Sequence, residues 1–230
     1  MEPQHRRQLL TVNVGRPAPS AHTDADGGRT GFDKRPVDGP VTVAAPGPKG
    51  LAGSGLTGDS VVDIRHHGGD DQAVYAYARE DLDVWQHELD RELANGAFGE
   101  NLTTSGVEVT GARIGERWRI GRRVLLEVTS PRVPCRTFQG RMGRSGWIKR
   151  FTQAGLPGAY LRVIEPGEIQ AGDGVGLVFR PDHDITVGLV FRAVTTRREL
   201  LPRLLAAGDA LHPEARGRAL AYIERQRKGS

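Results

Sequence analysis

Seven short apolar runs, most of them bounded by turn residues, place the strongest limit on how this chain can fold. Runs of this length are typical of strands, and turn sequences such as IGRR at 120–123 and AGDG at 171–174 separate them. Many short strands with turns between them predict a barrel or closed sandwich. We therefore expect a mainly β fold, a β-barrel with a few helices. The runs cover residues 61–65, 73–78, 117–120, 124–129, 160–164, 175–180 and 186–191.

One amphipathic helix interrupts the strand pattern at residues 80–93. Leu82, Trp85, Leu89 and Leu93 fall on one face of it, which predicts a core stripe and nothing more specific. Residues 15–58 are rich in glycine and proline and predict strands joined by long loops. The string GSGLTG at 53–58 has the letters of a dinucleotide fingerprint but lacks the strand before it and the helix after it, so we reject that interpretation.

The period of the pattern changes near residue 193. The sequence TRRE at 196–199 has the form of a capping box before a helix at 200–207, and residues 213–227 predict another helix. We therefore predict two units, a β-barrel domain over 1–185 and a small C-terminal helical segment over 186–230. Residues 184–230 hold nine bases and five acids and so carry the whole net charge of +4. Such a segment could dock a partner or cover an open sheet edge, and the sequence favours neither.

The distribution of charge limits the classes of partner. Residues 59–100 hold eleven acids and three bases, whereas residues 113–162 hold twelve bases and two acids. The basic block lacks interleaved aromatics over most of its length, and the acidic block would repel a phosphate backbone, so nucleic acid is not expected as the primary partner. A pocket for a small anionic ligand is the better explanation. We see no signal peptide and no run of 18 apolar residues, and so expect a cytoplasmic protein with no membrane association.

Cys135 is the only cysteine of the chain, which excludes an internal disulfide and every multi-cysteine metal site. It follows an apolar run and lies in PRVPCR at 131–136, between two prolines and two arginines. A stiff turn in a positive field favours thiolate over thiol, so we interpret Cys135 as a working cysteine and not as a buried apolar residue.

Three other segments carry residue types that a site needs. GFDKRPV at 31–37 offers two cations on a turn, and FGENL at 98–102 offers an amide and a carboxylate. DIRHHGGDDQA at 63–73 offers paired histidines before a diglycine, where backbone can approach a ligand closely. Adjacent strand residues point to opposite faces, so His66 and His67 are not expected to share a metal. A papain-like pair of Cys135 with one of these histidines is conceivable, but no oxyanion hole or third group is marked.

These segments, taken in order, resemble the MOSC domain, the molybdenum cofactor sulfurase C-terminal domain, in its stand-alone bacterial form with three C-terminal helices. The resemblance spans about residues 9–225. It rests on six motifs: GDSVVDIRHHGG at 58–69, YAY at 75–77, FGENL at 98–102, RIGERW at 113–118, PRVPC at 131–135 and PGAYLR at 157–162.

The resemblance implies a β-barrel fold, a molybdenum cofactor with Cys135 as catalytic residue and metal ligand, and reduction of N-hydroxylated bases such as hydroxylaminopurine. A soft thiolate suits molybdenum, and a basic, glycine-lined pocket suits the phosphate and pterin of the cofactor. The implied partners are a small N-hydroxylated substrate and an electron-donating reductase, for which residues 186–230 are a candidate docking surface. The expected cofactor contacts are Lys34, Arg35, His66, His67, Gly68, Asn101, Arg132 and Arg136.

One departure and two alternatives accompany this assignment. Where relatives often read HHGGPDKA, this chain has Asp70, Asp71 and Gln72, so a cation is lost beside the expected pocket. Cys135 could instead carry a persulfide and deliver sulfur to a metal centre, or the domain could be a non-catalytic anion-binding module. Pyridoxal phosphate is not expected, because no lysine lies in a recognisable cofactor-linkage context.

Overall fold

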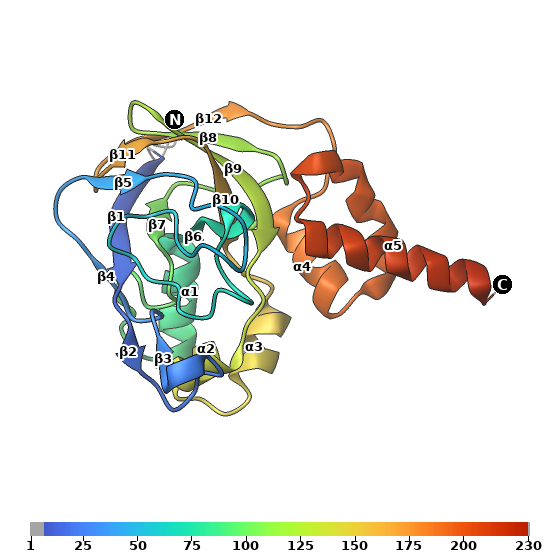
Figure 1. The fold of residues 1–230 in the computed structure, drawn as a ribbon, viewed down its shortest axis with the longest axis horizontal. Helices are drawn as coiled ribbons and strands as arrows, with labels where there is room; N and C mark the ends of the chain where they lie inside the picture. Colours follow the sequence, from blue (N-terminus) through green and yellow to red (C-terminus); the bar gives the residue numbers. More distant parts are fainter. Residues whose placement is uncertain (1–6, 230) are drawn as a thin grey trace.

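The computed structural model describes residues 7–229, and a mixed sheet of eight strands forms its body (Figure 1). The strand order is β12-β8-β9-β10-β6-β7-β1-β4, with β6 and β7 parallel and every other neighbouring pair antiparallel. The bounds are Gln8–Gly15 (β1), Lys34–Pro36 (β4), Val74–Ala78 (β6), Leu102–Ser105 (β7), Arg117–Ile120 (β8), Val124–Pro131 (β9), Ala159–Glu165 (β10) and Val175–Phe179 (β12). Two small sheets pair β5 (Val41–Val43) with β11 (Gly167–Ile169), and β2 (Ala18–Pro19) with β3 (Arg29–Thr30).

The large sheet curls until its two sides meet. An isolated bridge joins Gln8 at the start of β1 to Gly174 directly before β12, and the Leu9 amide donates to the Asp173 carbonyl at 2.8 Å. No continuous ladder between β1 and β12 is present in the described part of the chain. The predicted mainly β fold with a helical C-terminal segment is therefore confirmed, but the expected barrel is a curled sheet, joined by the bridge and the backbone hydrogen bonds around it.

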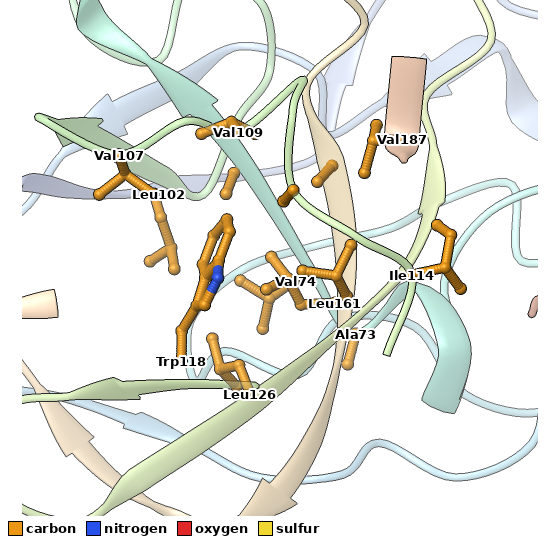
Figure 2. Close-up of a cluster of buried hydrophobic side chains, with 14 of the residues drawn as sticks. Ala73, Val74, Leu102, Val107, Val109, Ile114, Trp118, Leu126, Leu161 and Val187 are labelled. Carbon is orange, nitrogen blue, oxygen red and sulfur yellow. The ribbon is translucent and has the colours of Figure 1, made fainter. Parts of the chain in front are cut away.

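The main core fills the inside of this curl. Burial alternates along β8, where Trp118 and Ile120 are buried while the arginines beside them are partly exposed. Figure 2 shows Trp118 among side chains from other strands of the sheet, including Val74 of β6, Leu126 of β9 and Leu161 of β10. The period-2 pattern that predicted the strand thus also selects the residues that fill the core.

A second, aromatic cluster lies under the helices that follow β6 and β9. These are α1 (Arg79–Leu89), α2 (Arg136–Met142) and α3 (Trp147–Ala154). Phe98 lies at the centre of the cluster, with ring centroids 5.0 to 6.2 Å from those of five other aromatic residues. The predicted helix at 80–93 is confirmed in type but ends earlier, because Asp90 takes a left-handed conformation with φ of 48°. The cluster fixes the position of α2, and Cys135 directly precedes α2.

The C-terminal segment is helical from an earlier residue than the pattern predicted. It consists of α4 (Val187–Thr195), a 3-10 stretch (Arg198–Ala210) and α5 (Pro213–Lys228), with shorter 3-10 turns elsewhere at Asp26–Gly28 and Asp70–Gln72. The strand predicted at 186–191 is wrong. Thr186 caps α4 by accepting a hydrogen bond from the Leu189 amide at 3.1 Å, and the apolar run that follows fits a helix as well as a strand.

Two further local predictions are also wrong. The predicted capping box is not formed, since Thr196 ends α4 and no side chain of the described residues caps the start of the 3-10 stretch, which contains Pro202. The strand predicted at 61–65 is a loop with a turn at 64–66.

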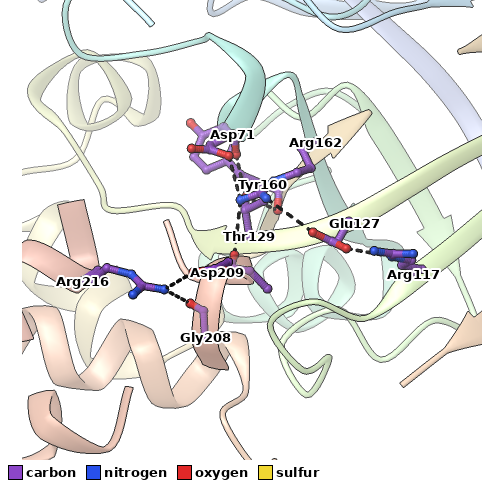
Figure 3. Close-up of polar contacts among 10 residues, drawn as sticks. Asp71, Arg117, Glu127, Thr129, Tyr160, Arg162, Gly208, Asp209 and Arg216 are labelled. Carbon is purple, nitrogen blue, oxygen red and sulfur yellow. Dashed lines mark hydrogen bonds and ion pairs between the residues drawn. The ribbon is translucent and has the colours of Figure 1, made fainter. Parts of the chain in front are cut away.

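The helical segment packs on the sheet and extends it to one side (Figure 1). Its buried residues Val190, Leu204 and Ala219 belong to the same apolar cluster as the strands. Arg162 of β10 adds a polar tie by donating to the Ala210 carbonyl at 3.4 Å, and it also pairs at 2.7 Å with Asp71, which lies in the 3-10 turn before β6 (Figure 3). The segment therefore covers part of the sheet. Among residues 7–229, no helix has the length and hydropathy to cross a membrane.

Candidate functional site

A cavity of 380 Å³ opens where β9 runs into α2, and it brings together most of the residues predicted from sequence. Ligand pockets commonly measure about 300–1,000 Å³, so its size suits a cofactor. We call it the Cys135 pocket. Of the predicted site residues, those in its lining are Lys34, His66, His67, Gly68, Asn101, Arg132, Cys135 and Arg136.

Cys135 is half-buried at the position that precedes the first turn of α2. Burial by itself would raise the pKa of the thiol. A hydrogen bond from the His67 side chain, the charge of Arg132 and the backbone N–H of Phe138 outweigh it and lower the pKa to about 6. The thiolate is therefore the prevailing form at neutral pH, and it faces the cavity.

Arg132 is the main cation of the pocket and is only 6% exposed. Its guanidinium carbon lies 4.2 Å from the centroid of the Phe138 ring and 4.9 Å from that of Phe32, and it donates to the Phe98 carbonyl. Among residues 7–229, no carboxylate forms an ion pair with it. A buried cation without an anionic partner raises the affinity of the pocket for a negative group, either the Cys135 thiolate or a bound anion.

Lys34 has an anionic partner of its own within the scaffold. It forms a buried ion pair with Asp59, whose carboxylate also accepts from the Gly15 amide at 2.8 Å and from the Asn101 side chain at 2.9 Å. Burial lowers the pKa of Lys34 although Asp59 opposes this, whereas Lys34 and its neighbours hold the pKa of Asp59 below its ordinary value against the effect of burial. Lys34 is therefore less available to an anion than the sequence suggested.

Asn101 likewise serves the scaffold. Its side-chain oxygen accepts from the Tyr75 amide at 3.1 Å, and its side-chain nitrogen donates to the Asn13 carbonyl at 3.3 Å as well as to Asp59. Both ends of the amide are occupied, so Asn101 ties β7 to β1 and to the loop that carries Asp59. A cofactor group that accepts from the Asn101 amide nitrogen would have to replace one of these bonds, because both of its N–H donors are in use.

The predicted cations at the edge of the site are exposed and paired. Arg136 forms an ion pair with Asp24 at 2.6 Å at the rim of the pocket. Arg35 does not lie in the pocket: its side chain is 79% exposed, it pairs with Asp33 at 3.2 Å, and it lines a separate surface cavity. The structure therefore does not bring Arg35 together with the other predicted site residues.

The histidine loop approaches the pocket as a turn and not as a strand. His66 is exposed and His67 half-buried, and both amides bond to the Asp63 carbonyl, at 3.3 and 3.0 Å. The argument that the two histidines face opposite ways on a strand therefore does not apply, and both line the cavity. Gly68 has a φ of +78°, and a side chain there would lie 2.5 Å from the Gly53 carbonyl, so only glycine allows the loop to pack here.

Sequence reasoning missed three residues of the site. Tyr160 and Gln72 line the cavity, and Asp59 holds Lys34. Burial raises the pKa of Tyr160, so its hydroxyl stays protonated beside Arg132. Tyr160 lies in PGAYLR and Gln72 in the loop that departs from its relatives, so both were visible as motif positions. Asp59 is the second residue of the motif at 58–69, but nothing in the motif indicated a contact with Lys34.

Comparisons with known proteins show the family to which the chain is related. The family model described as MOSC domain matches residues 63–176. YflK of Bacillus subtilis is 33% identical over 184 residues, covering 80% of this chain and 79% of YflK. A Gibberella moniliformis protein named "Reductase" is 32% identical over 194 residues, covering 82% of this chain but 32% of that protein. The crystal structure of YiiM from Geobacillus stearothermophilus superimposes with a TM-score of 0.73 at 25% identity, covering 94% of this chain and 98% of that one.

Proposed function

The chain belongs to the MOSC domain family, and we propose that it is an oxidoreductase that binds a molybdenum cofactor through Cys135 and reduces N-hydroxylated bases. The observation that carries the proposal is the Cys135 thiolate, with a pKa lowered to about 6, facing a cavity beside a buried arginine that pairs with no carboxylate among the described residues. The fungal relative is a much longer protein, and this chain covers 32% of it. Its name is consistent with reductase activity but does not assign that activity to the part that this chain matches.

The residues of the pocket fit such a cofactor. Cys135 offers a soft ligand for molybdenum, and Arg132 offers a buried positive charge for an anionic group. Among residues 7–229, no three His, Cys, Asp or Glu side chains are placed to hold a metal ion by themselves. A metal in this pocket would therefore arrive with an organic ligand of its own, as in a pterin cofactor.

The protein residues would position and shield the reaction. His67 keeps the sulfur of Cys135 deprotonated, Arg132 balances the negative charge, and the rings of Tyr75 and Tyr160, 5.1 Å apart, limit access of water. The bound cofactor would supply two-electron redox chemistry. Reduction of an N–OH group to N–H consumes two electrons and two protons and releases water. The electrons would come from a reductase, for which residues 186–230 remain the proposed docking surface.

The test is the molybdenum content of the full chain purified from a host that makes molybdopterin. We expect about one molybdenum per chain, and loss of it in Cys135→Ser, because a protonated hydroxyl is a poor substitute for a soft thiolate. Equal molybdenum in the serine variant would overturn the assignment of Cys135.

A matched pair of arginine variants tests the charge of the pocket. Arg132→Gln should weaken cofactor retention by about 1.5–3 kcal/mol, the range for a hydrogen bond to a charged group. Arg35→Gln removes the same charge outside the pocket and should leave retention unchanged. Equal retention in both variants, at unchanged melting temperature, would show that Arg132 does not contact the cofactor.

A sulfur carrier is the second candidate, because the same thiolate could hold a persulfide. It predicts protein without molybdenum whose mass at Cys135 is greater by one sulfur atom, removable by a reductant. Mass spectrometry before and after reduction separates the two functions. A chain with neither metal nor extra sulfur would favour the non-catalytic anion-binding module.

A further inference from the structure

The turn between β2 and β3 forms one wall of the Cys135 pocket and lies next to α2 (Figure 1). We call residues 20–28, which make up this turn, the hairpin strap. Thr23 and Asp24 of the strap line the pocket. Ala25 is the one buried residue of the strap, so few apolar contacts hold it against the rest of the protein. The position of the strap therefore depends mainly on polar contacts.

Two polar contacts tie the strap to the start of α2. The Arg136 guanidinium pairs with the Asp24 carboxylate at 2.6 Å, and the Thr137 hydroxyl donates to the His22 carbonyl at 3.2 Å. The two side chains of the ion pair are 61% and 68% exposed. Ion pairs in contact with water contribute little to stability and weaken as salt rises. These contacts therefore hold the strap in place without preventing it from opening.

A third contact ties the strap to the histidine loop. Arg65, two residues before His67, donates to the Asp24 carbonyl at 3.2 Å, and its side chain is exposed. The strap is thus attached both to the segment that carries His67 and to the segment that begins α2 with Cys135. Because the His67 side chain bonds to the Cys135 sulfur, the strap joins the two segments that meet at the reactive group.

Gly140 shows how closely the strap fits α2. A Cβ atom at this position would lie 2.1 Å from the Cγ and 2.3 Å from the Cβ of His22. The His22 side chain therefore lies against the bare backbone of α2, and any larger residue at position 140 would displace the strap. Gly140 lies inside α2, where alanine would favour the helix more. The contact with the strap, and not the helix, accounts for this glycine.

The strap has hydrogen bonds of its own and can move as a unit. The Ser20 amide donates to the Gly28 carbonyl at 2.8 Å, and the Gly28 amide donates to the Ala25 carbonyl at 3.1 Å. Gly27 and Gly28, with φ of 78° and 62°, make the turn in a conformation that glycine favours. All these bonds lie within the strap, so they remain when its contacts with α2 and the histidine loop break.

We propose that the hairpin strap is a lid on the Cys135 pocket, which must open before an anionic cofactor reaches Cys135, and that Asp24 and Arg136 are its latch. Opening separates the two charges and leaves Arg136 as an unpaired cation at the entrance, where it attracts an anion. The identity of this ligand rests on the proposed function, whereas the motion of the strap does not.

The test measures access to Cys135 in full-length, cofactor-free protein by the rate of alkylation at about pH 8, where the thiol is already ionised. Iodoacetamide is the small reagent, and pyrenylmaleimide is a neutral reagent with a large flat ring system. We expect Asp24→Asn and Gly140→Ala to raise the pyrenylmaleimide rate about threefold and the iodoacetamide rate much less. Salt should also raise the pyrenylmaleimide rate of the wild type, because it screens the pair of Arg136 and Asp24.

Two matched variants make the same exchanges away from the strap. Asp38→Asn removes an exposed carboxylate that forms no ion pair with a described residue. Gly217→Ala adds a methyl group on α5, where no atom lies within 4 Å of it. Both variants should react with the two reagents at the rates of the wild type.

The outcomes decide the inference without reference to the metal. A faster pyrenylmaleimide reaction in either strap variant, with iodoacetamide changed less, supports the lid. The lid is overturned if both variants react with pyrenylmaleimide as the wild type does, or if both reagents speed up by the same factor, which would place the effect on the sulfur itself. Asp24→Asn changes an exposed side chain and decides the test alone if Gly140→Ala does not fold. A lid found in protein that never binds molybdenum would stand while the proposed function fails.

Discussion

At the scale of single residues, the site depends on a few contacts that change how Cys135 and Lys34 ionise. The thiol of Cys135 would titrate above its ordinary value of 9.0 if burial acted alone, yet His67, Arg132 and the Phe138 amide lower its pKa to about 6. His67 comes from a loop almost seventy residues earlier in the chain. Of the three groups that lower the pKa of Cys135, His67 is the one that a single substitution removes most cleanly.

Alkylation of cofactor-free protein by iodoacetamide measures this directly. We expect the rate to rise with pH around a midpoint of about 6 and the midpoint to move up in His67→Ala, since the stabilising hydrogen bond is lost. His66→Ala, at the exposed neighbour, should leave the midpoint where it was. Because the folded pKa lies below the unfolded one, the thiolate stabilises the fold fully above about pH 9, and this stabilisation is lost as the pH falls through about 6. A midpoint near 9 in the wild type would contradict this description of the site.

The buried pair of Lys34 and Asp59 makes a different prediction, about stability. Lys34→Met leaves the buried Asp59 carboxylate without its cationic partner and should cost about 3–5 kcal/mol of unfolding free energy. Lys34→Met combined with Asp59→Leu removes both charges and should recover much of that loss. Chemical denaturation measures both variants. If Lys34→Met is as stable as the wild type, Lys34 does not form the pair and is available to an anion.

The sequence predicted the chemistry of Cys135 itself better than it predicted which residues surround Cys135. The flanking arginines indicated a positive field at Cys135. Arg132 provides this field, whereas the side chain of Arg136 points away and pairs with Asp24. The roles of His67 and Asp59 depend on contacts between distant segments, which local composition does not encode.

At the scale of elements, the sequence predicted strands that have turns on both sides. It did not predict the conformation of the apolar run at 186–191, which fits a strand as well as a helix. The predicted strands at 117–120 and 124–129 correspond to β8 and β9, which meet at a short turn. The run VGLVF at 187–191 has no polar residue to reveal its period, and it forms α4 because Thr186 caps it and both faces find apolar neighbours. The parallel pairing of β6 with β7 depends on the whole sheet and not on either strand.

A pair of threonine variants tests which residue caps a helix. Thr186→Ala should lower the unfolding free energy by about 1 kcal/mol, since it removes the side-chain acceptor for the Leu189 amide. Thr196→Ala, at the cap that the sequence pattern suggested, should change stability little because no described residue donates to its side chain. The reverse order of effects in thermal denaturation would contradict the assigned start of α4.

At the scale of the whole molecule, the helical segment covers the sheet, and its far end remains open to a partner. Its apolar residues continue the core of the sheet, which the change of period in the sequence did not reveal. The exposed bases Arg225 and Arg227 lie in the last turn of α5, away from the sheet (Figure 1). Covering the sheet and docking a reductase are therefore compatible, because they use different parts of the segment.

Charge reversal at the end of α5 tests the docking of a reductase with an acidic surface. Arg225→Glu with Arg227→Glu should reduce turnover driven by the reductase and leave turnover with a small artificial donor unchanged. Reductase-driven turnover of the wild type should also fall as salt rises, because exposed charges are screened over about 8 Å at physiological ionic strength. Arg122→Glu with Arg123→Glu, on the exposed turn between β8 and β9, is the matched control. Equal loss in both double variants would exclude α5 as the specific docking surface.

X-ray absorption at the molybdenum edge tests the central claim, that the Cys135 sulfur binds the metal. Wild-type protein and Cys135→Ser would be measured side by side in the presence of excess cofactor, which places molybdenum in the variant although the variant does not retain it through purification. We predict that one sulfur scatterer in the first shell of the wild type is replaced by oxygen in the variant. Identical first shells in the two proteins would contradict the claim and leave the thiolate free for another role.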